Sequence, residues 1–206
     1  MSMSLRRGGL LVAFAVHVVG CASSAPALVV ATGDTTSPSS AVSRYLALFD
    51  GRIWAYDEED EETKTGGIFV TRARKLTGAR FSLTTGERAR IVEMRADGVA
   101  TENGIYLLKM PLAVGAEWPG EHGSNVRVAA VDKVVQVPAG TFAGCVETVE
   151  NLASPMGGEN PLRRITTQFC PDVGIASLRV EVWEQGKHAG ERAVLRSFGE
   201  PVTIVK

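Results

Sequence analysis

Short apolar runs separated by turn signals extend along most of this chain. From Arg52 onward, short β-like runs rich in apolar residues alternate with turn signals such as Gly, Pro, Asn or Asp. Short runs at this spacing, bounded by turn residues, are typical of strands. The sequence therefore predicts about ten strands, at 53–56, 68–74, 80–83, 89–95, 104–110, 125–137, 146–149, 164–169, 175–183 and 192–198.

The spacing of these runs leaves little room for helices. Only Val42, Tyr45, Leu46 and Phe49 have the spacing of one or two helical turns. Strands that follow one another closely pair with antiparallel neighbours. We therefore predict an all-β fold, either a single curved antiparallel sheet or an open half-barrel, with a β-sandwich as the alternative. In the longest run, 125–137, the alternation changes phase near Ala129, which indicates a β-bulge.

One motif occurs twice at the start of a predicted strand. Leu48 to Trp54 and Leu112 to Trp118 both have the form Leu-x-x-Gly-x-x-Trp. Glycine can adopt the positive φ that a tight turn requires, and the tryptophan can then enter the core. The two copies are either a duplicated structural unit or the same turn used twice, and we favour the shared turn.

The N-terminus has the features of an export signal. Arg6 and Arg7 precede an apolar stretch from Leu10 to Val19, and Gly20 and Cys21 follow it. A positive start, a short apolar stretch and a small residue before the cut are typical of a secretory signal peptide. The stretch is about half of the roughly 20 residues that a membrane-spanning helix needs.

The residues around Cys21 resemble bacterial lipoprotein signals, in which a small residue precedes the lipid-modified cysteine. This resemblance implies cleavage before Cys21 and attachment of acyl chains such as palmitate to it. The alternatives are an ordinary signal peptide cut near residues 22–25 and an uncut membrane anchor. Ala22 follows the cysteine where Asp would favour retention, so the resemblance implies a cell outer membrane location.

These features divide the chain into three parts. Residues 1–20 are the predicted lipoprotein signal peptide, 21–43 a flexible tether rich in Ala, Ser, Thr, Pro and Gly, and 44–206 a single β-rich domain. The whole chain has 206 residues and a formal net charge of −1. It has no basic stripe, which argues against nucleic acid as a partner. The membrane, reached through the N-terminal lipid, is the expected partner.

Cysteine usage agrees with export. If Cys21 carries lipid, Cys145 and Cys170 remain as an even pair in an oxidising compartment. They lie in successive predicted strands, so a cross-strand disulfide is geometrically reasonable. The alternative is two buried, unpaired thiols.

Four motifs together resemble a group of uncharacterised bacterial envelope lipoproteins. They are Gly-x-x-Trp-x-Tyr at 51–56, Pro-Leu-x-x-Gly-x-x-Trp at 111–118, Val-Pro-Ala-Gly-Thr-Phe at 137–142 and Pro-x-Val-Gly-Ile at 171–175. Ala47 stands where the family usually has proline, and Asp172 where the late motif usually has glycine. The resemblance implies a curved, mostly antiparallel sheet and no assigned enzyme activity. The residues of the 137–142 motif have the character of a turn that anchors to the core.

The sequence offers little for catalysis or metal binding. Outside the predicted signal peptide, its histidines are His122 and His188, both in turn-like segments, and no Gly-x-Ser-x-Gly motif occurs. The cysteines and histidines lack the close pairs typical of zinc sites, and the carboxylates at 57–62 lack calcium-loop spacing. We interpret that acidic run as a solvated hairpin tip. The sequence predicts no enzyme, no cofactor and no metal site.

Two functions remain open. The first is a lipid-anchored binding or accessory protein of the envelope, whose concave sheet face holds a hydrophobic ligand. Its candidate lining residues are the aromatics of the early strands, Trp54, Tyr56, Phe69, Phe81 and Trp118. The alternative for these side chains is that they fill the core. The second function is a structural protein that docks another envelope component and binds no small ligand.

Overall fold

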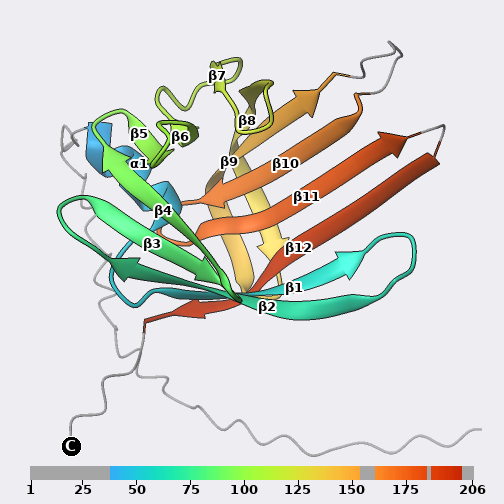
Figure 1. The fold of residues 1–206 in the computed structure, drawn as a ribbon, viewed down its shortest axis with the longest axis horizontal. Coiled ribbons are helices and arrows are strands. Elements are labelled where there is room, and N and C mark those ends of the chain that lie inside the picture. The colour runs from blue at the N-terminus through green and yellow to red at the C-terminus, as the bar shows by residue number, and fades with distance from the viewer. Residues whose placement is uncertain (1–37, 154–160, 185–186, 201–206) are drawn as a thin grey trace, which may run out of the picture. The chain divides into compact units, whose positions relative to one another are not determined.

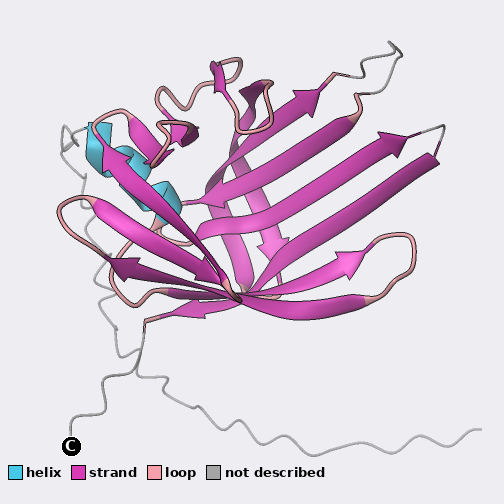
Figure 2. Cartoon of the chain, in the orientation of Figure 1, coloured by secondary structure: helices cyan, strands magenta, loops and turns pink. Residues whose placement is uncertain are grey.

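The computed structural model describes residues 38–153, 161–184 and 187–200, and within them one helix and twelve strands (Figures 1 and 2). Among these residues, no helix is long and apolar enough to cross a membrane. The elements are α1 (Pro38–Leu46), β1 (Ile53–Asp60), β2 (Gly66–Lys75), β3 (Arg80–Thr85), β4 (Arg88–Arg95), β5 (Gly98–Thr101), β6 (Tyr106–Lys109), β7 (Glu117–Pro119), β8 (Asn125–Val137), β9 (Gly140–Leu152), β10 (Arg163–Cys170), β11 (Gly174–Glu184) and β12 (Lys187–Gly199).

All twelve strands belong to one antiparallel sheet, so the all-β single-sheet prediction is confirmed and the sandwich alternative is wrong. The sheet has two strands more than expected, β5 and β7. These strands have four and three residues, too few to show an alternating pattern.

The strands follow one another as a meander, and the sheet curves until β12 pairs with β1. The order is interrupted once, between β6 and β7, which are the two edges of the sheet. These edges approach each other, because the Trp118 Nε1 on β7 donates a 3.1 Å hydrogen bond to the Tyr106 carbonyl on β6. The sheet is therefore nearly closed, rather than the open half-barrel of the sequence prediction.

The hairpin of β8 and β9 bends where the sequence changes phase. The register between the two strands shifts between Val128 and Val135, which confirms a bulged region beginning beside Ala129. Beyond the bend, β8 contacts β11 and β12, which are not its neighbours in the sheet. The two-residue turn holds this contact, because Ala139 donates its backbone N–H to the Leu195 carbonyl of β12. The Val-Pro-Ala-Gly-Thr-Phe motif is thus a hairpin tip anchored on another strand.

The two Leu-x-x-Gly-x-x-Trp copies have the same backbone geometry. Gly51 and Gly115 both adopt positive φ, 78° and 88°. In the first copy, the Gly51 N–H donates to the Ala73 carbonyl on β2, and the Ala73 N–H donates to the Arg52 carbonyl. In the second copy, the Gly115 N–H donates to the Val128 carbonyl on β8, and the Val128 N–H donates to the Ala116 carbonyl. The motif therefore initiates β1 and β7 by the same turn.

The copies differ at their first residue. Ala47 has a φ of 45°, which proline cannot adopt, whereas a cis peptide bond precedes Pro111. The absence of proline at residue 47 therefore matches the conformation of this turn.

Helix α1 covers one end of the sheet's interior. Val42 and Leu46, four residues apart on one helical face, are almost fully buried and pack against the cluster that contains Trp118. Arg44, on the exposed side, forms a salt bridge with Asp172 between β10 and β11, and its guanidinium lowers the pKa of that carboxyl. Residues 38–43, which the sequence pattern assigns to the tether, form the first part of this helix.

Cys145 on β9 and Cys170 on β10 are joined by a disulfide, and both are fully buried. The bond continues the β9–β10 ladder by one position beyond its last pair, Val146 with Phe169. Closing a loop between residues 25 apart in sequence stabilises the fold by about 3 kcal/mol in the chain-entropy description.

We predict that Trp118→Ala destabilises the domain strongly. Trp118 is 3% exposed, so its loss opens a cavity and leaves the Tyr106 carbonyl at the sheet edge without its donor. The expected loss in unfolding free energy is about 3–5 kcal/mol, measured by denaturant unfolding. Trp183→Ala, the same change at a half-buried tryptophan, is the control and should cost clearly less. Equal losses for the two variants would contradict this role of Trp118.

Candidate functional site

The five aromatic residues expected to line a ligand site belong to the core. Trp54, Tyr56 and Phe69 pack in one apolar cluster, whereas Phe81 and Trp118 pack in a second one. Tyr56 and Phe69 stack with their ring centroids 5.0 Å apart. All except Phe69 are less than 9% exposed.

The polar atoms of these aromatic side chains are used internally. Trp54 Nε1 donates to the Val173 carbonyl at 2.6 Å, and the Tyr56 hydroxyl donates to the Ile175 carbonyl at 3.0 Å. Burial raises the pKa of the Tyr56 hydroxyl, which stays protonated. The structure therefore does not bring the five aromatics together as a binding surface.

A different group of side chains lines a cavity of about 340 Å³, which we call the polar pocket. Its residues come from the β1–β2 turn and from β9 to β12: Glu61, Glu147, Thr166, Gln168, Ser177, Arg179 and Arg192. On β11, Ser177 and Arg179 share one face, while Leu178 between them packs against the core. The pocket thus lies on the opposite face of the sheet from Leu178.

Cross-strand register arranges these side chains in two rows. Thr166, Arg179 and Arg192 are direct partners across β10, β11 and β12, which places them in one row. Glu147, Gln168 and Ser177 are partners across β9, β10 and β11 and form the other row. Because strands rather than loops carry both rows, the pocket is held by the hydrogen-bond ladders of the sheet.

Glu61 reaches the pocket from the β1–β2 turn. Its carboxylate accepts two hydrogen bonds from Arg179, at 2.9 Å to Nε and 2.7 Å to Nη2. The turn is fixed on β12 by a hydrogen bond from the Glu61 N–H to the Gly190 carbonyl. A Cβ on Gly190 would lie 2.4 Å from the Glu61 carboxylate, so a larger residue there would displace it. The Arg179 hydrogen bonds lower the pKa of Glu61 below its usual value.

Glu147 is the second carboxylate of the pocket. It accepts hydrogen bonds from Lys133 on β8 and from Gln168 on β10, the latter at 2.9 Å. Burial by itself would raise the pKa of Glu147, but these hydrogen bonds outweigh that effect, and its pKa is lowered. Both pocket carboxylates are therefore ionised at neutral pH.

The acidic run at 57–62 is solvent-accessible, as predicted, but most of it belongs to the end of β1 rather than to the hairpin tip. Its first four residues are in β1, so their side chains alternate between the two faces. Three members form ion pairs: Asp57 with Arg196, Glu59 with Lys64, and Glu61 with Arg179. Strand alternation therefore separates the like charges, and neighbouring cations neutralise half of the run.

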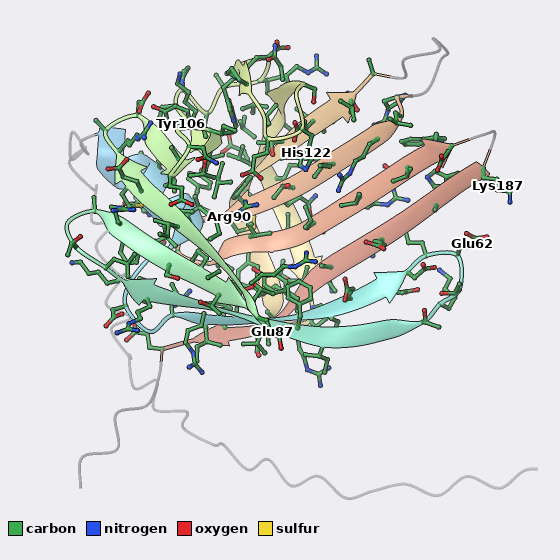
Figure 3. The ribbon with its side chains drawn as sticks, in the orientation of Figure 1. Glu62, Glu87, Arg90, Tyr106, His122 and Lys187 are labelled. Atoms are coloured by element: carbon green, nitrogen blue, oxygen red, sulfur yellow. A yellow bond between two sulfur atoms is a disulfide. The ribbon has the colours of Figure 1, made fainter. Side chains whose placement is uncertain are left out.

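His122 lies in the loop between β7 and β8 and is labelled in Figure 3, whereas His188, expected in a turn, is the second residue of β12 and pairs with Trp183. His122 Nδ1 lies 3.0 Å from a Glu150 carboxylate oxygen, and the Ser124 hydroxyl donates to the same carboxylate. The carboxylate thus separates the serine from the imidazole, whereas an activated nucleophile needs its base in direct contact. The His188 ring packs against Trp183 at a tilt of 39°, and its Nε2 lies 3.3 Å from a Glu181 carboxylate oxygen.

The described residues contain no group of three or more His, Cys, Asp or Glu side chains with the arrangement of a metal site.

Sequence reasoning did not identify the residues of the polar pocket. Arg179 and Arg192 lie inside predicted strands, and each has the outward phase that an ordinary solvent-facing residue also has. The signal for their proximity is the pairing of β11 with β12, and that register is not visible in either strand alone.

Solved structures with distant similarity to this chain include two bacterial proteins. A protein of Bacteroides fragilis classed as exported, with a YmcC-like fold, is 11% identical with a TM-score of 0.44. A protein of Parabacteroides distasonis classed as a lipoprotein is 12% identical with a TM-score of 0.39. Each alignment covers 75% of this chain and 98% of the other. No family model and no curated protein matches the sequence. These similarities assign neither a family nor a function to the chain.

We predict that Glu61→Gln flattens the acid dependence of stability. Because the folded-state pKa of Glu61 is depressed, its pairing with Arg179 stabilises the fold above the ordinary pKa of 4.5. This contribution is lost as the pH falls through the folded-state pKa. Unfolding free energies measured between neutral pH and pH 3 should therefore fall less for the variant than for the wild type. Glu62→Gln, at the exposed next residue, is the matched control and should follow the wild type. Parallel profiles for Glu61→Gln and wild type would contradict the pairing.

Proposed function

We propose that this protein is an exported, lipid-anchored protein of the bacterial cell envelope that acts by binding a small ligand. The observation that carries the binding role is the polar pocket, in which charged and polar side chains from four strands and one turn converge. Its strands belong to a nearly closed sheet that carries a disulfide. A rigid frame of this kind keeps binding groups in place without the entropy cost of ordering them.

The chemistry of the pocket favours binding over catalysis. A general acid that works near neutral pH needs a raised carboxyl pKa. The pKa values of Glu61 and Glu147 are lowered instead, by their hydrogen bonds to Arg179 and Lys133. Both groups therefore act as fixed negative charges that orient the neighbouring cations.

The envelope location is supported from two directions. The lipoprotein signal pattern ends at Cys21, which lies outside the described residues. The Cys145–Cys170 disulfide is the kind of bond that persists in oxidising compartments. Ala22, following the cysteine, favours the outer membrane within this proposal.

Membership in the motif-sharing group of envelope lipoproteins is part of the same proposal. Asp172, which replaces the usual glycine of the late motif, has a φ of 62°. This left-handed conformation explains why glycine is usual there, and aspartate is one of the few other residues that tolerates it. Here the aspartate gains the salt bridge to Arg44.

A docking role is the second candidate, and it has an observation of its own. Ile68 and Val70 occupy the same face of β2 and are 61% and 44% exposed. Adjacent exposed apolar side chains of this kind are compatible with a protein contact.

Lipid attachment is tested by Cys21→Ala. The variant should incorporate no radiolabelled palmitate and should accumulate as uncut precursor, since the thiol that accepts the lipid is missing. Ser24→Ala, three residues on, is the control and should be labelled and cut normally. Palmitate incorporation by Cys21→Ala would contradict the lipoprotein assignment.

The binding role is tested on protein purified from its native membrane. Native mass spectrometry should show a small molecule of constant mass bound to the intact chain, and Arg179→Gln should reduce its occupancy because the pocket loses a cation. A chain that carries no small molecule but crosslinks to one envelope protein through β2 would favour docking instead.

A further inference from the structure

Two arginines stand directly opposite each other in the polar pocket. Arg179 on β11 and Arg192 on β12 are partners in the antiparallel register. Like charges in that relation repel each other and destabilise a sheet. Water, a counter-charge inside the protein or a bound ligand can each offset this repulsion, and here Arg192 is exposed and Arg179 partly exposed.

The internal counter-charges account for one arginine. Glu61 binds Arg179 through two hydrogen bonds, and Glu181 lies 3.3 Å from the same guanidinium. The other pocket carboxylate, Glu147, forms an ion pair with Lys133. Glu59, which pairs with Arg192 in the β1–β12 register, forms an ion pair with Lys64 instead.

Arg192 is left with a charge that acts only at longer range. Within the described part of the chain, its side chain forms no ion pair and no hydrogen bond, although its charge helps to lower the pKa of Glu61. The guanidinium is a rigid fork of donors that matches a carboxylate or a phosphate group. The neighbouring Thr166 and Ser177 add hydroxyl groups to the same cavity.

We propose that the polar pocket binds a small polar anion, whose carboxylate or phosphate group pairs with Arg192. This inference rests on the proposed binding function and adds the chemical class of the ligand. Thr166 and Ser177 hydrogen-bond the polar remainder of the molecule. Glu61 and Glu181 offset the charge of Arg179, so Arg192 is the cation that pairs with the anion.

The size of the cavity is consistent with this ligand class. Its volume of about 340 Å³ lies at the lower end of the range for small-molecule sites. The cavity walls are polar, which differs from the mostly apolar lining usual in sites for drug-like molecules. A compact hydrophilic anion replaces the water of such a cavity more readily than an apolar ligand does.

The test is calorimetric titration of the full mature chain, lipid included, in nanodiscs of neutral lipid. The probes are acetate, inorganic phosphate and glucose 6-phosphate, with glucose as the uncharged counterpart of the last. Acetate and phosphate separate the two anionic groups. We expect binding of at least one anion, weakened by added salt, and no binding of glucose.

Variants place the anion at Arg192. Arg192→Gln should weaken anion binding about tenfold or more, as expected for loss of a charged hydrogen-bond partner. Arg74→Gln makes the same charge change at an exposed position of β2 outside the pocket, and its affinity should stay within about twofold of wild type. Arg192→Lys retains the charge without the fork and should bind with intermediate affinity. A thermal unfolding profile for each variant confirms that it is folded.

Three outcomes would overturn the proposal: unchanged affinity in Arg192→Gln, equal binding of glucose and its phosphate, or no response to any anion at about 10 mM. A neutral molecule found bound to the native protein would support the proposed binding function but contradict the anionic ligand class. Absence of any bound small molecule from the native protein would instead reject the proposed function.

Discussion

The pairing of β1 with β12 is the constraint on which the rest of the structure depends. These are the first and last described strands along the chain and lie side by side in the middle of the sheet, and their register joins Trp54 to Phe198 and Tyr56 to Leu195. Arg52, just before β1, is almost fully buried, and its guanidinium lies 4.6 Å from the ring centroids of both Phe49 and Phe198. A buried cation between aromatic rings gains electrostatic attraction that offsets part of its desolvation. Backbone, aromatic and cationic contacts therefore all stabilise the β1–β12 pairing.

The β1–β12 pairing also creates the polar pocket. Glu61 follows β1, whereas Arg179 and Arg192 are more than 100 residues away along the chain. Only the β1–β12 pairing brings the β1–β2 turn onto β12, where Gly190 leaves space for the carboxylate. The pocket and the near-closure of the sheet therefore depend on the same strand pairing. Figure 3 shows Glu62 and Lys187 near the ends of the β1–β2 and β11–β12 hairpins.

The division between the two faces of the sheet explains why the pocket is polar. The apolar face is occupied by the aromatic side chains, whose polar atoms bond to buried carbonyls. A hydrophobic ligand on that face would have to displace Trp54 or Tyr56 and leave those carbonyls unsatisfied, which is costly. Binding on the opposite face needs no such rearrangement. Of the charged side chains that line the pocket, Glu61, Glu147 and Arg179 form ion pairs, whereas Arg192 forms none among the described residues.

Much of this fold could be predicted because strand alternation is a local property. The other ten strands, the bulge near Ala129 and the glycine turn before each tryptophan all follow from patterns over a few residues. The two missed strands are short, and β5 is buried at all four positions, so it shows no alternation. Nearly complete closure could not be inferred, because curvature accumulates over the whole sheet. The pocket could not be inferred for the related reason that Arg179 and Arg192 become neighbours only through register.

The disulfide has a mechanical role in this geometry. β9 pairs with β10 as far as Val146 and then departs with the bent hairpin toward β12. Cys145 is the first residue beyond that ladder, and its bond to Cys170 holds β9 at the point where hydrogen bonding to β10 ends. Without it, the bend could migrate along the ladder, since a one-residue slip reverses the face of each following side chain. Val135 and Val137 would then turn away from the core, and Glu147 would turn away from the pocket. A covalent bond at residue 145 therefore fixes both the core packing of the hairpin and the row of polar side chains that begins two residues later.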